Sequence, residues 1–136
     1  MSLPLLALDG SAVFAILLDE PEAARCRETM RAADKIILSA GSLTEMLVVA
    51  AGKDVSHPVA DLLNLIRPEI VPLTEERALA ASQAYRRWGK GFHAARLNIC
   101  DTFAYALAIE FGCPLLFVGN DFAQTDIVSA LPAESW

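Results

Sequence analysis

Short apolar runs alternate with segments of helical periodicity along this chain, and that alternation limits the folds it can adopt. The apolar runs predict strands at 5–8, 35–39, 69–73 and 115–118, with a weaker one at 127–131. The segments between them predict helices at 11–18, 21–33, 42–51, 59–66, 74–88 and 101–111. Strands this apolar are typical of a parallel sheet covered by helices on both faces. The sequence therefore predicts an α/β fold with a twisted, mainly parallel sheet of four or five strands.

Four acidic residues stand beside or within apolar segments, where an uncompensated charge is costly. Asp9 follows the first predicted strand and Asp121 follows the fourth, while Glu45 and Asp101 lie near the starts of two predicted helices. Ligands of open parallel sheets bind beyond the carboxyl ends of the strands, so the fold allows these four carboxylates to converge. Hard oxygen ligands suit Mg²⁺ or Mn²⁺, and an ion held in this way serves phosphate chemistry.

Several of these residues also have plainer interpretations. Asp9 or Asp101, taken alone, could cap a helix, although Ser11 is the expected N-cap of the first helix. Asp126 could be a fifth metal ligand or a turn residue. Asn120 could support the site through hydrogen bonds or simply form a turn.

The net charge of −6 argues against non-specific binding of nucleic acid, but one segment runs against this average. From residue 86 to residue 96 the chain carries basic residues and no acid. Arg87, Lys90, His93 and Arg96 could grip the phosphates of a nucleic acid, or they could form an ordinary solvated face.

Bulk features point to one globular domain in a reducing compartment. The chain has 136 residues, of which 54% are hydrophobic, and no apolar run reaches the roughly 18–20 residues of a membrane helix. The apolar N-terminal stretch has no basic region before it, so we expect no signal peptide. Cys26, Cys100 and Cys113 lack metal-ligand spacing and are expected to be free thiols in the cytoplasm.

Motifs along nearly the whole chain resemble those of VapC-type PIN-domain toxins. The opening segment 8–23, which contains Leu8-Asp9-Gly10-Ser11-Ala12, is similar to the first family motif, and 39–49 is similar to the second. Segment 85–101 is the most specific match, and 114–127 matches the closing motif. Two positions depart from the family pattern: Gly10 replaces a commoner Thr or Ala, and Asn120 stands where many relatives have a second Asp.

The resemblance implies a single PIN domain over residues 1–136, with a three-layer α/β/α fold. It also implies the toxin component of a type II toxin–antitoxin system, with Mg²⁺- or Mn²⁺-dependent endoribonuclease activity. Carried over by position, Asp9, Glu45, Asp101 and Asp121 are the metal-binding catalytic acids, and Ser11 is the hydroxyl beside the first of them. The family further implies an RNA substrate, a homodimer, and a VapB-type antitoxin that blocks the active-site groove with its C-terminal segment.

Other acid-rich α/β classes fit the residues less well. A receiver domain needs an acidic pair after the first strand and an acceptor Asp after the third, but here the third strand ends in Pro72-Leu73. A haloacid-dehalogenase-type phosphatase needs a second Asp two residues after Asp9, where Ser11 stands. The remaining alternative is a catalytically silent PIN-like module that binds metal or RNA and acts through its antitoxin complex.

Overall fold

The computed structural model describes residues 3–131 and contains a parallel sheet of four strands in the order β3-β2-β1-β4. The strands are β1 (Leu6–Leu8), β2 (Ile36–Ser39), β3 (Glu69–Val71) and β4 (Leu115–Leu116). In the centre of the sheet Ala7 pairs with Ile37 on one side and with Leu115 on the other. All four carboxyl ends therefore meet at one edge of the sheet, as the predicted fold requires.

Within residues 3–131, six helices cover the sheet, and most begin close to where the helical periodicity begins. They are α1 (Gly10–Leu17), α2 (Ala23–Ala32), α3 (Ala40–Gly52), α4 (Ser56–Ile66), α5 (Glu75–Trp88) and α6 (Ile99–Phe111). Thr74 caps α5 as predicted, because its hydroxyl accepts a hydrogen bond from the Arg77 N–H at 3.2 Å.

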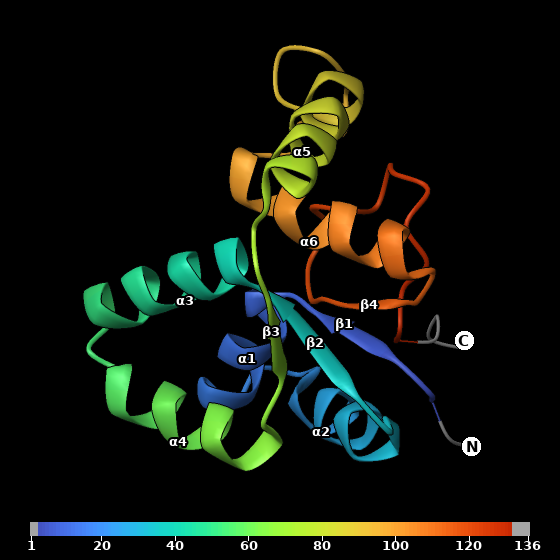
Figure 1. Cartoon of the computed structure of the whole chain (residues 1–136). Helices are drawn as coiled ribbons and strands as arrows, with labels where there is room; N and C mark the ends of the chain where they lie inside the picture. The colour runs from blue at the N-terminus through green and yellow to red at the C-terminus, as the bar shows by residue number, and fades with distance from the viewer. Residues whose placement is uncertain (1–2, 132–136) are drawn as a thin grey trace.

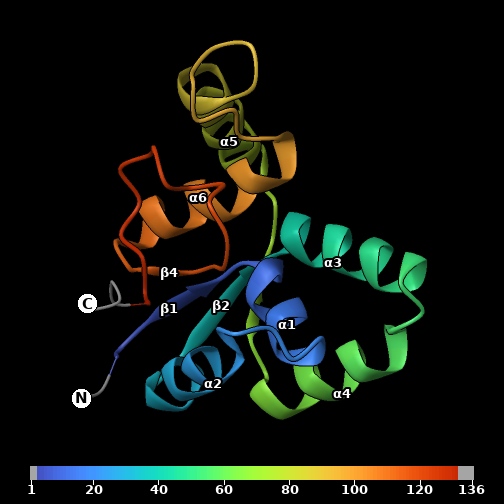
Figure 2. The same ribbon diagram turned by 180° about the vertical axis from the view of Figure 1, so that it is seen from behind.

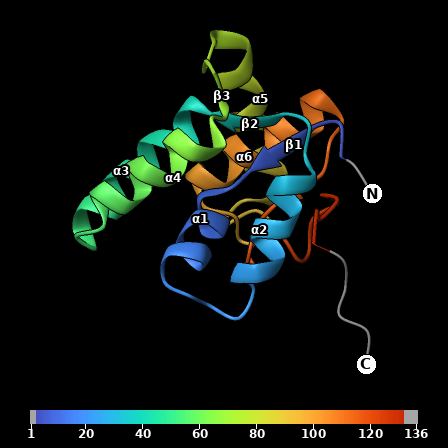
Figure 3. The same cartoon turned by 90° about the horizontal axis from the view of Figure 1, so that it is seen from below.

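Alternate residues along the strands point into two separate cores, which gives the molecule three layers. Leu6 and Leu8 pack with α1 to α4 on one face of the sheet, whereas Ala7 packs with α5 and α6 on the other. Figure 1 shows the two groups of helices on opposite sides of the sheet, and Figure 2 shows α1 among α2, α3 and α4. The pair α3 and α4 extends beyond the sheet on one side (Figure 3). The predicted three-layer α/β/α architecture is confirmed.

Two local predictions were wrong. The N-cap of α1 is Asp9 rather than Ser11, because the Asp9 carboxylate accepts a hydrogen bond from the Ser11 N–H. Segment 127–131 forms only an isolated bridge between Ser129 and Leu115 instead of a fifth strand. There the Ser129 hydroxyl bonds both the N–H and the C=O of Leu131, and this local bonding competes with a longer ladder.

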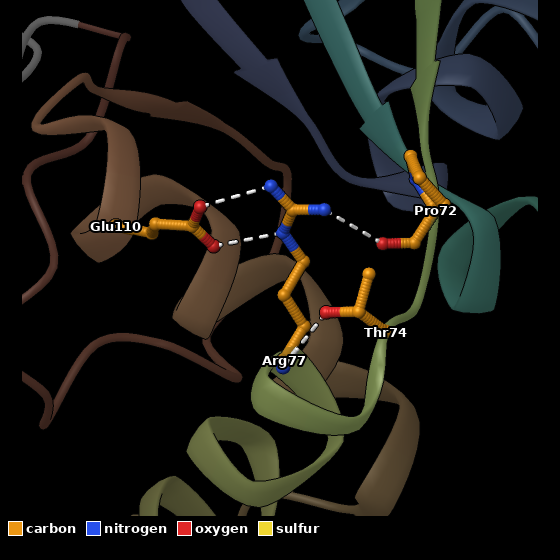
Figure 4. Close-up of polar contacts among 4 residues, drawn as sticks. All are labelled: Pro72, Thr74, Arg77 and Glu110. Carbon is orange, nitrogen blue, oxygen red and sulfur yellow. Dashed lines mark hydrogen bonds and ion pairs between the residues drawn. The ribbon is translucent and has the colours of Figure 1, made fainter.

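An ion pair joins the helices of the second layer. Arg77 near the start of α5 makes two bonds of 3.0 Å to the carboxylate of Glu110 on α6, and a third to the carbonyl of Pro72 (Figure 4). This planar fork holds the chain after β3 and the first turn of α5 against the C-terminal end of α6. The opposite end of α6, which carries Asp101, therefore projects from a fixed helix.

Candidate active site

Asp9 lies directly beyond β1 and is held by contacts with the end of β4 and with Ser11 in α1. Its backbone N–H donates to the carbonyl of Leu116 at the end of β4, 3.0 Å away. Its carboxylate accepts from both the N–H and the hydroxyl of Ser11, and that hydroxyl in turn accepts from the Val118 N–H at 3.0 Å. The side chain is thus fixed at the edge of the sheet where β1 and β4 end.

The environment of Asp9 disfavours its charged form. Burial raises the pKa of Asp9 above its usual value, the hydrogen bonds from Ser11 lower it, and the charges of Glu45 and Asp121 raise it further. Burial outweighs the hydrogen bonds, so the net shift is upward. A neighbouring cation would reverse this balance.

Asp101 occupies the third position of α6 and completes a capping box with Asn98. Its carboxylate accepts from the Asn98 N–H at 3.1 Å, and its own N–H donates to the Asn98 side chain at 3.0 Å. Burial raises the pKa of Asp101 to about 7; the Asn98 hydrogen bond opposes this, and the charges of Asp121, Asp9 and Glu45 add to it. The sequence spacing from Asn98 to Asp101 is the signal that would have identified this cap.

Glu45 is half-buried on α3 and contacts Cys100, a residue that sequence reasoning did not place in the site. The pKa of the Cys100 thiol rises to about 11 through burial, through a hydrogen bond with Glu45, and through the charges of Glu45, Asp101 and Asp9. Only the position of Cys100 beside Asp101 in the sequence hints at this contact. The thiol stays protonated at neutral pH and acts as a donor to Glu45.

Asp121 and Asn120 lie exposed on the turn after β4. The structure therefore brings the four predicted acids to one end of the sheet, where the charges of Glu45 and Asp121 raise the pKa values of both Asp9 and Asp101. In the described residues 3–131, however, no three Asp, Glu, His or Cys side chains are arranged so that they could hold a metal ion together. The donor set still fits a hard divalent cation, because it consists of four carboxyl groups and offers only oxygen ligands.

Asp126 belongs to a different set of contacts. One of its oxygens accepts from the hydroxyl of Tyr105 at 2.6 Å, and the other lies 3.8 Å from the guanidinium of Arg87. Both oxygens therefore have partners away from the four acids, which favours a structural role over that of a fifth ligand.

The basic segment forms a closed loop after α5. The N–H of Lys90 donates to the carbonyl of Leu97, and the N–H of Leu97 donates to the carbonyl of Trp88. This loop lies at the end of the molecule farthest from α4 (Figure 2). His93 packs edge-on against the Trp88 ring, and its Nδ1 accepts from the Ala95 N–H at 2.9 Å.

The four basic side chains differ in how tightly they are held. The Arg87 guanidinium lies over the Trp88 ring, 4.7 Å from its centre, as well as beside Asp126. Lys90 and Arg96 are exposed, and Arg96 has a left-handed backbone with φ of 57°. Exposed cations on a closed loop are suited to contacts with phosphates, although the same features occur on ordinary surfaces.

Two simpler predictions concern the whole chain. Cys26, Cys100 and Cys113 are all free thiols, as expected. Within residues 3–131, no helix combines the length and the apolar character needed to cross a bilayer.

Comparison with known proteins gives one consistent family. The PIN domain family matches residues 6–128 of the chain. The chain is 40% identical over 131 residues to ribonuclease VapC30 of Mycobacterium tuberculosis, which covers 93% of this chain and 100% of that protein. It is 37% identical over 124 residues to ribonuclease VapC42 of the same organism, with 88% and 95% covered.

Solved structures with the same fold are more distant in sequence. The crystal structure of M. tuberculosis VapC20, a toxin that cleaves the sarcin–ricin loop, superposes with a TM-score of 0.75 at 13% identity and covers 93% of this chain and 99% of that one. A toxin–antitoxin complex from Klebsiella pneumoniae gives a TM-score of 0.69 at 16% identity, with 92% and 97% covered. At these identities the likeness establishes the fold.

Proposed function

Because this chain belongs to the VapC-type ribonucleases of the PIN-domain family, we propose that its four clustered acids carry out divalent-metal-dependent hydrolysis of RNA. It is an endoribonuclease, the toxin component of a toxin–antitoxin pair. Asp9, Glu45, Asp101 and Asp121 are its catalytic acids, and Mg²⁺ or Mn²⁺ is their metal. The observation that carries this proposal is the burial of Asp9 and Asp101 at the edge where β1 and β4 end, with the charges of Glu45 and Asp121 near enough to raise the pKa of both.

The position of each side chain suits it to a different role in the reaction. Asp9, Asp101 and Asp121 would hold the ion, which when bound supplies Lewis acidity at the phosphate and lowers the pKa of a bound water. Glu45, half-buried and bonded to Cys100, orients the attacking water and accepts its proton as the water oxygen bonds to phosphorus and the bond to the leaving oxygen breaks. Ser11 fixes the Asp9 carboxylate, and Asn120 supports the turn that carries Asp121.

The basic loop would bind the RNA backbone. Lys90 and Arg96 are exposed and available for phosphate contacts, while the side chains of Arg87 and His93 pack against the Trp88 ring. Contacts of this kind position the strand but do not select its sequence. The RNA target is therefore set by the shape of the surface around the acids.

The partners follow from the family. An antitoxin partner is supported by the toxin–antitoxin complexes that share the fold. We propose in addition a VapB-type antitoxin whose C-terminal segment blocks the acidic site, a homodimer, and action in the cytoplasm. Co-expression with the product of the neighbouring gene, followed by light scattering of the purified protein, tests the first two points.

Cleavage of RNA by the wild type and by Asp101→Asn tests the enzymatic proposal. Asn keeps an oxygen for the Asn98 cap but removes the charge, and Asp54→Asn is the matched control because Asp54 is exposed and has φ of 56°, which Asn tolerates. We expect Asp101→Asn to lose more activity than the roughly 10–100-fold that outer partners of metal ligands contribute, and EDTA to abolish cleavage by the wild type. Equal cleavage by the wild type and Asp101→Asn would refute the assignment and leave the silent binding module as the better description.

A further inference from the structure

Four side chains from three segments form a closed network beside the acidic site. The Trp88 indole N–H at the end of α5 donates to the hydroxyl of Tyr105 on α6 at 3.0 Å. That hydroxyl donates to Asp126 at 2.6 Å. Asp126 also faces the Arg87 guanidinium at 3.8 Å, and Arg87 lies over the Trp88 ring. Every polar group of this network has a partner within it.

The network touches the two segments that carry Asp101 and Asp121. Tyr105 lies four residues after Asp101 on α6, so the two side chains lie on the same face of that helix one turn apart. Asp126 lies five residues after Asp121 in the segment that follows β4. The Tyr105–Asp126 bond therefore joins the helix of one acid to the turn of another.

The turn that carries Asp121 is internally bonded, so an anchor at one end fixes the other. The Ala123 N–H donates to the Asn120 carbonyl, and the Thr125 N–H donates to the carbonyl of Phe122, both at 3.1 Å. The Phe122 ring is buried and packs 5.0 Å from that of Phe117, between centroids. A short segment tied in this way moves as a unit.

Asp121 needs such an anchor. It is exposed on a turn, and its charge lies near enough to Asp9 and Asp101 to raise the pKa of both. The Tyr105 side chain, by contrast, is only 6% exposed and has a fixed donor behind it in Trp88.

We propose that the hydrogen bond from Tyr105 to Asp126 holds the Asp121 turn against α6, so that Tyr105, Asp126 and Trp88 are positioning residues of the metal site and Asp126 is not a ligand. This inference rests on the proposed function. It predicts that the network controls how tightly the protein binds a divalent ion, without a direct contact to that ion.

Calorimetric titration of the purified protein with Mn²⁺ separates a positioning residue from a ligand. Tyr105→Phe and Asp126→Ala should each weaken Mn²⁺ binding about 10–100-fold, as outer partners of ligands do. Because both variants remove the same Tyr105–Asp126 bond, the double variant should bind Mn²⁺ no more weakly than the weaker of the two single variants. Asp126→Asn keeps an oxygen that accepts from Tyr105 and should retain most of the affinity, whereas Asp121→Asn should lose it.

Kinetics provide a second readout that a purely structural role would not produce. Tyr105→Phe leaves the Arg87–Asp126 pair in place, so its KM for RNA should stay at the wild-type value while kcat falls at limiting Mn²⁺ and recovers at saturating Mn²⁺. Trp88→Phe, which keeps the ring under Arg87 but removes the donor to Tyr105, should show a weaker form of the same effect. It also serves as the test if Tyr105→Phe does not fold.

Two results would overturn the inference while leaving the proposed function intact. One is wild-type Mn²⁺ affinity and kcat in Tyr105→Phe. The other is loss of Mn²⁺ binding in Asp126→Asn as complete as in Asp121→Asn, which would make Asp126 a ligand. If Asp101→Asn and the wild type cleave RNA equally, the proposed function fails and this inference fails with it.

Discussion

The Ser11 hydroxyl lies 2.5 Å from Oδ2 of Asp9 and donates to it while accepting from the backbone of Val118. This hydroxyl is one of the groups that lower the pKa of Asp9 against the effect of burial. It therefore favours the charged form that a cation requires, and it ties β1 to the end of β4 at the same time.

Replacing Ser11 with Ala should raise the pKa of Asp9 further and weaken Mn²⁺ binding about 10-fold, with the loss growing as the pH falls. Titrations with Mn²⁺ at several pH values measure the effect. Ser82→Ala, at an exposed site on α5, is the control. An affinity ratio between Ser11→Ala and wild type that does not change with pH would show that the hydroxyl acts on geometry alone.

Without metal, the protein should lose stability as the pH rises toward neutral. Folded Asp101 keeps its proton up to a pKa of about 7, whereas in the unfolded chain it loses the proton near 3.8, so the folded state binds more protons between these values. Raising the pH through this window should lower the free energy of unfolding by about 2–4 kcal/mol for this group.

The difference in unfolding free energy between wild type and Asp101→Asn isolates this contribution, because Asn does not titrate. Urea denaturation of both proteins at a series of pH values measures it. As the pH rises, the unfolding free energy of Asp101→Asn should increase relative to that of the wild type. Added Mg²⁺ should reduce this increase. A difference that stays constant across the window would contradict the raised pKa.

Gly41 near the start of α3 sets the spacing between the helices that carry Glu45 and Asp101. A Cβ at this position would lie 2.5 Å from the ring of Phe103 on α6. Gly41→Ala should therefore destabilise the fold by about 1–3 kcal/mol and reduce cleavage, because α3 and α6 must separate.

Gly52→Ala is the matched control on the same helix. A Cβ there meets nothing within 4 Å, so this variant should be neutral or more stable by up to about 1 kcal/mol. Thermal unfolding and RNA cleavage of both variants check the prediction. Equal behaviour of the two would mean that the α3–α6 contact yields easily.

Lys90→Ala should weaken RNA binding through the loss of one phosphate contact. We expect KM to rise with kcat unchanged, and the slope of log K against log salt to fall by about 0.7 for a single strand. Fluorescence anisotropy at several salt concentrations measures the slope. Lys53→Ala, at an exposed position after α3, should change neither quantity, and a result for Lys90→Ala that matches it would place the loop outside the RNA path.

Periodicity and capping chemistry predicted most of the backbone, because they depend on neighbours in the sequence. The apolar strands and the Thr74 cap are examples, and the family motifs predicted the fold and the class of activity. The positions of the acids at the sheet edge followed from the topology of a parallel sheet. The ligand set at the metal site stays a prediction.

Contacts between side chains that are distant in the sequence could not be predicted from it. Cys100 meets Glu45 from another helix, and Asp126 meets Tyr105 from 21 residues away. Such pairs depend on how helices pack across a core, which local patterns do not encode. The wrong cap on α1 has a different cause, because Asp9 and Ser11 lie two residues apart and both satisfy the local capping pattern.

Asp9 and Asp101 each combine the proposed catalytic role with a structural one, since Asp9 caps α1 and Asp101 completes the capping box of α6. Replacing either with a side chain that cannot accept a hydrogen bond should damage a helix start as well as the proposed chemistry. A gene for this toxin that is inactivated by such a change is therefore expected to yield a less stable protein. Neutral Asn is the change that can silence the nuclease and still leave a folded decoy able to occupy the antitoxin.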